Sequence, residues 1–206
     1  MCRLLRSGLL LASFVPPQGI RELRDLTRYR RKLTQALSAE KNRIQKVLED
    51  ANVKISSVLS DTFGVSGNQM IEAIMEGKLS EAEIADLAKG TLKSKKEEIR
   101  EALVGYFQDH HRFMIRASLE HIKHLEKLIF DLDQETKKKL AQYPKEYESL
   151  QTIPGVKEQG AAAIITEIGA DMEIFPSEGH LSTWAGLSPG NNESSGKKKR
   201  KNNPRQ

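Results

Sequence analysis

The chain has 206 residues and a mass of 23.2 kDa, enough for one ordinary domain or two small ones and too little for a large multidomain assembly. Hydrophobic residues make up 38% and charged residues 30% of the chain, a balance typical of long exposed helices. Lys and Arg outnumber Asp and Glu by 33 to 28, and this excess favours a polyanionic partner. The single cysteine, Cys2, excludes a disulfide framework and a cysteine-rich zinc site. We expect a mostly helical, cytoplasmic protein.

A short apolar run near the N-terminus superficially resembles a signal peptide. It extends from Ser7 to Val15, is marginal in length, and leads into Pro16-Pro17, which is a poor cleavage context. It is also far shorter than the ~18 apolar residues that span a bilayer. The pattern therefore predicts a short buried helix that the prolines stop, and no membrane partner.

Two long amphipathic patterns predict the main architecture. The first indicates a helix from about Ile20 to Ser60; Glu40 is the one polar residue in its apolar stripe of Leu33, Leu37, Ile44, Val47 and Ala51. The second indicates a helix from about Ser94 to Ala141, with an apolar face of Ile99, Leu103, Tyr106, His110, Phe113, Ala117, Ile122, Leu125, Leu128 and Leu132. Short helices are expected over 70–75 and 80–88, the latter opened by a Ser80–Glu83 capping box. The predicted fold class is all-α, with a long antiparallel coiled-coil hairpin.

Prolines and glycines become frequent after Tyr143-Pro144, so a second, small helical domain is expected to begin near residue 145. The sequence Ile153-Pro154-Gly155-Val156 resembles the turn of a helix-hairpin-helix element, whose backbone amides can hold a DNA phosphate. Gly155 would allow close approach of the phosphate. Lys157 stands where a second glycine is expected, which weakens the amide nest but supplies a cation. The alternative is an ordinary Pro-Gly turn between packed helices.

Other chemistry-bearing residues give weaker indications. No set of histidines converges on a metal site, so we expect His110, His111, His121 and His124 to be polar positions on a solvated helix. No pair of carboxylates has the spacing of a two-metal centre. The basic stretch from Arg21 to Lys32 has two open interpretations. It is either a row of phosphate contacts or a helix flank paired with carboxylates.

The last part of the chain carries the most specific pattern. A short helix, capped by Ser177 and ending at Gly186, is expected to precede a loop with two serines beside five cations. Taken together, the hairpin turn, Phe175-Pro176, the run from Trp184 to Ser194 (WAGLSPGNNES) and the following Gly-Lys-Lys resemble the IS110 insertion-sequence transposases, a group that includes IS116 and IS902. The stretch from Ile20 to Arg31 is similar to the helix that enters the coiled coil of that family.

This resemblance implies a DNA recombinase that acts in DNA transposition. Members combine a RuvC-like domain, in which four acidic residues bind Mg²⁺, with a serine-bearing C-terminal domain; they form oligomers and are guided by a structured RNA. The acidic residues are missing here, so we expect a partial copy that is inactive alone, with no metal site and no cofactor of its own. The expected parts are a remnant of the upstream domain (1–17), the coiled-coil region (18–144), a partial transposase domain (145–196) and a basic tail (197–206).

The resemblance also implies site residues. The family's nucleophile directly follows a residue that matches Glu193, so Ser194 is the expected nucleophile. Nearby cations would stabilise the reacting phosphate: Lys197, Lys198, Lys199 and Arg200. Without the resemblance, Ser194 and Ser195 would simply be solvated loop residues.

Two rival functions stay open. The first is a non-enzymatic helical DNA- or RNA-binding protein that uses the hairpin and the basic tail; the second is a coiled-coil scaffold without a nucleic-acid partner. If the chain is a recombinase or a non-enzymatic nucleic-acid-binding protein, the expected partners are DNA, a guide RNA and further copies of the chain.

Overall fold

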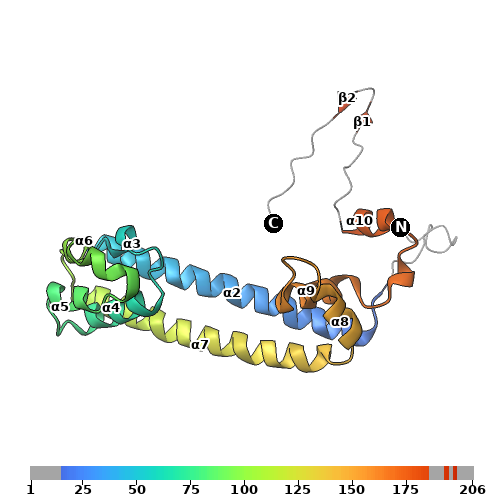
Figure 1. The fold of residues 1–206 in the computed structure, drawn as a ribbon, viewed down its shortest axis with the longest axis horizontal. Coiled ribbons are helices and arrows are strands. Elements are labelled where there is room, and N and C mark those ends of the chain that lie inside the picture. The colour runs from blue at the N-terminus through green and yellow to red at the C-terminus, as the bar shows by residue number, and fades with distance from the viewer. Residues whose placement is uncertain (1–14, 186–192, 195–196, 199–206) are drawn as a thin grey trace, which may run out of the picture.

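The structure is a computed structural model that describes residues 15–185, 193–194 and 197–198. Figure 1 shows two long helices side by side, with one group of small helices at each end. The strands in the described part are β1 (Glu193–Ser194) and β2 (Lys197–Lys198), which pair antiparallel. All other elements in the described part are helices, so the predicted all-α class is confirmed. Among the described residues, no helix is long and apolar enough to span a membrane.

Helix α2 (Gln18–Asp50) begins directly after Pro16-Pro17, as expected where proline fixes the backbone before a helix. The prediction that it continues to Ser60 is wrong. Asn52 takes a left-handed conformation with φ 58°, which asparagine tolerates better than most residues and which a helix cannot contain. The chain turns there and re-enters a short helix, α3 (Ile55–Val58).

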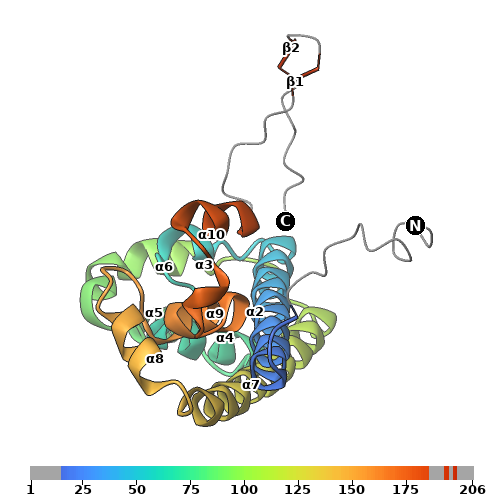
Figure 2. The same ribbon diagram turned by 90° about the vertical axis from the view of Figure 1, so that its right-hand side faces the viewer.

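Helix α7 (Asp109–Leu140) is the antiparallel partner of α2, and its predicted start near Ser94 is also wrong (Figures 1 and 2). The segment before it forms η1 (Gly90–Lys95) and α6 (Lys96–Ala102), and the chain then breaks at Gly105. Gly105 passes so close to the end of α2 that an added Cβ would lie 2.4 Å from the Ala51 carbonyl oxygen. The next amide, of Tyr106, donates to that same oxygen at 2.8 Å.

This break changes which face of α7 is buried. Tyr106 and Phe113, both predicted in the apolar face, are 74% and 68% exposed. His110 is exposed as well. The buried face instead consists of His111, Ile115, Ser118, Leu119, Ile122, Leu125, Thr136 and Leu140. The predicted face is thus correct at Ile99 and Leu103 before the break and at Ile122 and Leu125 of α7. It is wrong from Tyr106 to Ala117, because the prediction carried one helical phase through the break.

Four polar pairs join α2 and α7, and three of them share one register. From the N-terminal end of α2 they are Glu22–Lys139 at 2.7 Å, Arg30–Asp133, Glu40–His121 at 3.2 Å and Asp50–His111 at 3.3 Å. Glu22 and Glu40 are eighteen residues apart, and so are Lys139 and His121. Hydrogen bonds from Lys139 and then Gln18 lower the pKa of Glu22, so this carboxyl stays ionised in the pair.

The interior of the same seam is apolar. Leu33, Ile44 and Ala51 of the predicted stripe are buried, and Leu37 and Val47 are partly buried against the core. Glu40 is buried among them, with its carboxylate 2.9 Å from Arg43 Nη1. Knobs-into-holes packing, the hallmark of a coiled coil, stays a prediction.

One end of the helix pair carries a cap built from the connecting segment. It contains α3, α4 (Val65–Glu76), α5 (Glu81–Asp86), η1 and α6. The predicted capping box is confirmed: the Ser80 amide donates to Glu83 Oε2 at 2.8 Å, and the Glu83 amide to Ser80 Oγ at 3.4 Å. Arg112 of α7 donates to the Ile74 and Met75 carbonyl oxygens at 2.9 and 3.1 Å, which attaches the end of α4 to the long helix.

The other end carries α8 (Pro144–Gln151), α9 (Glu158–Ile168), η2 (Met172–Ile174) and α10 (Glu178–Trp184). A second apolar core joins this group to the long helices and includes Ile20, Leu23, Leu140, Ala162 and Ile165. Ser177 occupies the N-cap position of α10 as predicted, but its hydroxyl bonds His180 Nδ1 at 2.8 Å. The predicted domain boundaries stay predictions.

Gly105→Ala should lower the free energy of unfolding by about 1–3 kcal/mol, because the new methyl group overlaps a backbone oxygen that cannot move freely. Gly160→Ala is the matched control: it makes the same change inside α9, where the nearest atom lies 3.5 Å from the added Cβ. It should raise stability by roughly 0.5–1 kcal/mol. Urea unfolding of both variants checks the pair; equal effects would contradict the close approach at Gly105.

Candidate nucleic-acid interface

The turn between α8 and α9 is well defined. Two main-chain hydrogen bonds fold it: the Ile153 amide donates to the Leu150 oxygen at 3.2 Å, and the Val156 amide to the Ile153 oxygen at 3.0 Å. Gly155 has φ +88°, a conformation that favours glycine, and an added Cβ would find no atom within 4 Å. The turn is therefore open to an approaching ligand at Gly155, which has no side chain to cover the backbone.

Helix α9 starts beside this turn with unused donors. Lys157 occupies the N-cap position, is exposed, and gives no side-chain hydrogen bond to the helix. The first amides of a helix have no partner within the helix, and the partial positive charge there favours an anion. The exposed carboxylate of Glu158 opposes this charge, although Lys137 Nζ lies 3.9 Å from it. The turn thus combines Gly155, Lys157 and free amides on one exposed surface.

Helix α8 is held to the start of α9 by Tyr147, whose hydroxyl donates to the Glu158 carbonyl oxygen at 3.4 Å. Burial, and next the nearby Glu158 carboxylate, raise the pKa of Tyr147, so its hydroxyl keeps the proton that this hydrogen bond needs. The packing side of α9 consists of Ala161, Ala162, Ile165 and Thr166. Among its apolar residues, Ala161 and Ile165 are buried, whereas Ile164 and Ile168 are half-buried.

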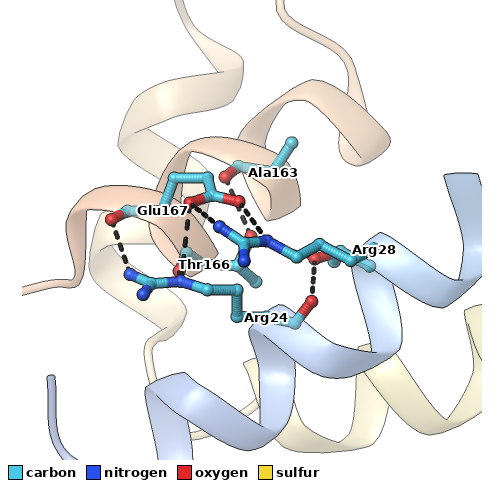
Figure 3. Close-up of polar contacts among 6 residues, drawn as sticks. Arg24, Arg28, Ala163, Thr166 and Glu167 are labelled. Carbon is cyan, nitrogen blue, oxygen red and sulfur yellow. Dashed lines mark hydrogen bonds and ion pairs between the residues drawn. The ribbon is translucent and has the colours of Figure 1, made fainter. Parts of the chain in front are cut away.

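Two arginines of α2 hold the far end of α9, as Figure 3 shows. Arg24 donates from Nε to the Thr166 carbonyl oxygen at 3.0 Å and from Nη2 to that of Glu167 at 2.9 Å. Arg28 binds both carboxylate oxygens of Glu167, at 3.1 and 3.0 Å, and this hydrogen bonding raises the pKa of Arg28. We call these four residues the arginine clamp. It fixes the orientation of α9, and hence of the turn, on the long helices.

The clamp shows which side chains of the basic stretch from Arg21 to Lys32 are paired within the protein. Arg24, Arg28 and Arg30 are taken up by the C-terminal carbonyls of α9, by Glu167 and by Asp133. In the described part of the chain, Arg21, Arg31 and Lys32 have no hydrogen-bond or ion-pair partner and are exposed. The paired-flank interpretation therefore holds for Arg24, Arg28 and Arg30, and both interpretations stay open for the exposed side chains.

The predicted serine site is only partly within the described residues. Ser194 lies in β1, and its backbone is registered opposite Lys197 of β2, while Glu193 is opposite Lys198. Ser195, Lys199 and Arg200 lie outside the described residues. Both views place β1 and β2 apart from the α8–α9 turn, so the structure does not bring Ser194 to Gly155 (Figures 1 and 2).

The histidines differ from the sequence prediction. His110 and His124 are exposed as expected, but His111 is buried and His121 bonds Glu40. The potential ligand atoms of Asp50, His110 and His111 lie within 4.8 Å of one another. However, His111 Nδ1 accepts from the Gln108 amide at 3.1 Å, so a neutral ring carries its proton on Nε2, the nitrogen that faces Asp50. This arrangement makes an ion pair or hydrogen bond and withholds the lone pair that a metal needs.

Sequence reasoning missed Glu167 and Asp50 as partners. Each lies more than sixty residues in sequence from the side chain that it contacts, and no local spacing points from one to the other.

Comparison with known proteins gives a match to a transposase family model. Residues 147–206 match the family model described as "Transposase IS116/IS110/IS902 family", and this stretch contains the turn, α9, α10 and the serine segment. No curated protein and no solved structure matches the chain.

Arg24→Ala should lower the free energy of unfolding by about 1.5–3 kcal/mol, because it leaves two carbonyls of α9 without their charged donor. Amide exchange within α9 should accelerate in the same variant. Arg21→Ala removes an exposed, unpaired arginine from the same helix and should change stability by less than about 0.5 kcal/mol. Unchanged exchange in α9 of Arg24→Ala would contradict the role of the clamp.

Proposed function

We propose that this chain binds DNA and acts in DNA transposition, because residues 147–206 match the model of the IS116/IS110/IS902 transposase family. The observation that carries the proposal is the open turn at Gly155, inside the matched region and at the start of α9. Backbone amides at such a position are a known way to hold a phosphate group.

The turn would work as a helix-hairpin-helix element. A DNA phosphate would approach Gly155, accept hydrogen bonds from the first amides of α9 and lie near the Lys157 ammonium group. The arginine clamp supports this role because it restrains α9 from its far end. Such contacts fix the position of the protein on a duplex without reading its sequence.

Ser194 is the proposed nucleophile. Its Oγ would form a bond to phosphorus while the ester bond to one deoxyribose oxygen breaks. The serine would give up its proton, and the leaving oxygen would take up a proton and depart as a free hydroxyl at the strand end. The register of Ser194 opposite Lys197 supports a cation beside the reacting phosphate. Lys198, Lys199 and Arg200 extend the same basic run.

The carboxylate-bound Mg²⁺ of the family does not fit the described residues. Mg²⁺ prefers six oxygen ligands, whereas the candidate cluster in the described part offers one carboxylate and two imidazoles. We therefore derive no step through a metal in this chain and propose that cleavage needs a domain that supplies the carboxylates. Because this cluster of one carboxylate and two imidazoles does not suit Mg²⁺, it favours the second candidate function, a non-enzymatic nucleic-acid-binding protein.

Self-association is part of the proposal. Phe113 and Phe130 of α7 are 68% and 62% exposed, and covering such side chains contributes about 25 cal/mol per Å² of apolar surface. We expect sedimentation at a protein concentration of tens of micromolar to show a homo-oligomer. A structured guide RNA is proposed on the family resemblance alone.

Lys157→Gln should weaken binding to a DNA duplex and reduce the slope of log K against log salt by about 0.9, the value for one phosphate contact. Lys145→Gln is the control. Lys145 is also exposed, but it lies at the start of α8 (Pro144–Gln151), whereas the turn follows the end of that helix. It should leave the slope unchanged. Fluorescence anisotropy at several salt concentrations gives both values. A scaffold without a nucleic-acid partner would show no binding at all.

The serine is tested by substituting residues 147–206 for the matching part of an active family member and measuring recombination. Ser194→Ala should abolish recombination, because no hydroxyl remains to attack phosphorus, whereas Ser195→Ala should retain it. Full activity of Ser194→Ala together with a dead Ser195→Ala would move the nucleophile to Ser195.

A further inference from the structure

We infer that the exposed side of α2 between Arg28 and Lys46 is a docking surface for duplex DNA, separate from the α8–α9 turn. This inference rests on the proposed function, since it assumes a DNA partner. The segment contains seven cationic residues and one carboxylate. That carboxylate, Glu40, is buried in the seam with α7, so the exposed side of the segment carries no negative side chain.

Four of the seven cations are already engaged. Arg28 and Arg30 pair with Glu167 and Asp133, Arg43 pairs with Glu40, and Lys41 lies 5.4 Å from the centre of the Phe63 ring. In the described part of the chain, Arg31, Lys32 and Lys46 are exposed and have no hydrogen-bond or ion-pair partner. These three charges are available to a ligand without breaking an existing contact.

Two of the three free cations, Lys32 and Lys46, share one side of the helix, and Arg31 flanks them about 100° from Lys32. Lys32 and Lys46 are fourteen residues apart, close to four turns at 3.6 residues per turn, so they point in nearly the same direction. Leu33 and Ile44 point to the opposite side and are buried against α7. The exposed positions between the lysines are small or polar, for example Gln35, Ala39 and Asn42. The surface is therefore an uncovered, straight and basic ridge, about 21 Å long between Lys32 and Lys46 at 1.5 Å per residue.

The chemistry of this ridge selects its partner. A membrane-binding helix needs bulky apolar residues beside its cations, and this side has none. A single-stranded nucleic acid binds by stacking on aromatic rings, and the one exposed aromatic side chain of the segment is Tyr29. Duplex DNA needs neither, because it presents about one negative charge per 1.7 Å of its axis. A rigid row of separated cations suits its phosphate backbones.

The experiment measures binding of the full chain to a duplex of about twenty base pairs at several salt concentrations. The test variant combines Arg31→Gln, Lys32→Gln and Lys46→Gln. The control variant combines Arg116→Gln, Lys127→Gln and Lys95→Gln, which remove the same charges from exposed positions elsewhere. Equal thermal midpoints show that both variants keep the fold. The salt slope of the test variant should fall by about 2.7, or 0.9 for each lost contact, and the control should keep the slope of the unaltered chain.

Other outcomes overturn the inference. An unchanged slope in the test variant would remove the ridge from the interface while leaving the proposed function intact, provided that Lys157→Gln still lowers the slope. Equal losses in test and control variants would mean that net charge alone drives binding. If the test variant lost affinity for a single strand, for duplex RNA or for an acidic protein, but not for duplex DNA, the ridge would belong to that other partner. Absence of DNA binding by the unaltered chain would contradict both proposals.

Discussion

The antiparallel packing of α2 against α7 is the constraint on which the rest of the structure depends. An apolar seam at Leu33 and Ile44 holds the helices together, and polar pairs from Glu22–Lys139 to Asp50–His111 align them. The two ends then use the same device. Arg112 of α7 donates to the last carbonyls of α4, and Arg24 of α2 to those of α9. Carbonyls at a helix end have no partner within the helix, so a guanidinium from the long helices satisfies them and fixes the attached helix.

This arrangement divides the arginines and lysines of α2 into two groups. Arg24 and Arg28 donate hydrogen bonds to α9, and Arg30 donates to α7. These bonds fix the orientation of the C-terminal helices. Side chains further along, such as Lys32 and Lys46, remain in solvent. The positive charge of the helix is thus partly structural and partly available. Only the available part contributes to attraction of a polyanion, because paired charges are largely neutralised at a distance.

Much of the fold could be predicted from the sequence because local patterns encode it. The capping box at Ser80, the two long helices and the Pro-Gly turn follow from short-range spacing. The break at Gly105 could not be found in this way, because it results from the approach of Ala51 from another helix. The clamp partner Glu167 was hidden for the same reason. At the candidate site, Gly155 and Lys157 could be identified from the turn motif, whereas Ser194 depended on the family resemblance.

The most direct test of the central claim, that the α8–α9 turn meets DNA, is formaldehyde cross-linking of the full chain to a duplex, followed by mass spectrometry of the attached peptides. Formaldehyde joins lysine amines to DNA bases that they approach. We expect attachment through the peptide that contains Lys157, at the exposed start of α9. Attachment confined to lysines of the cap, such as Lys93 and Lys95, would contradict it.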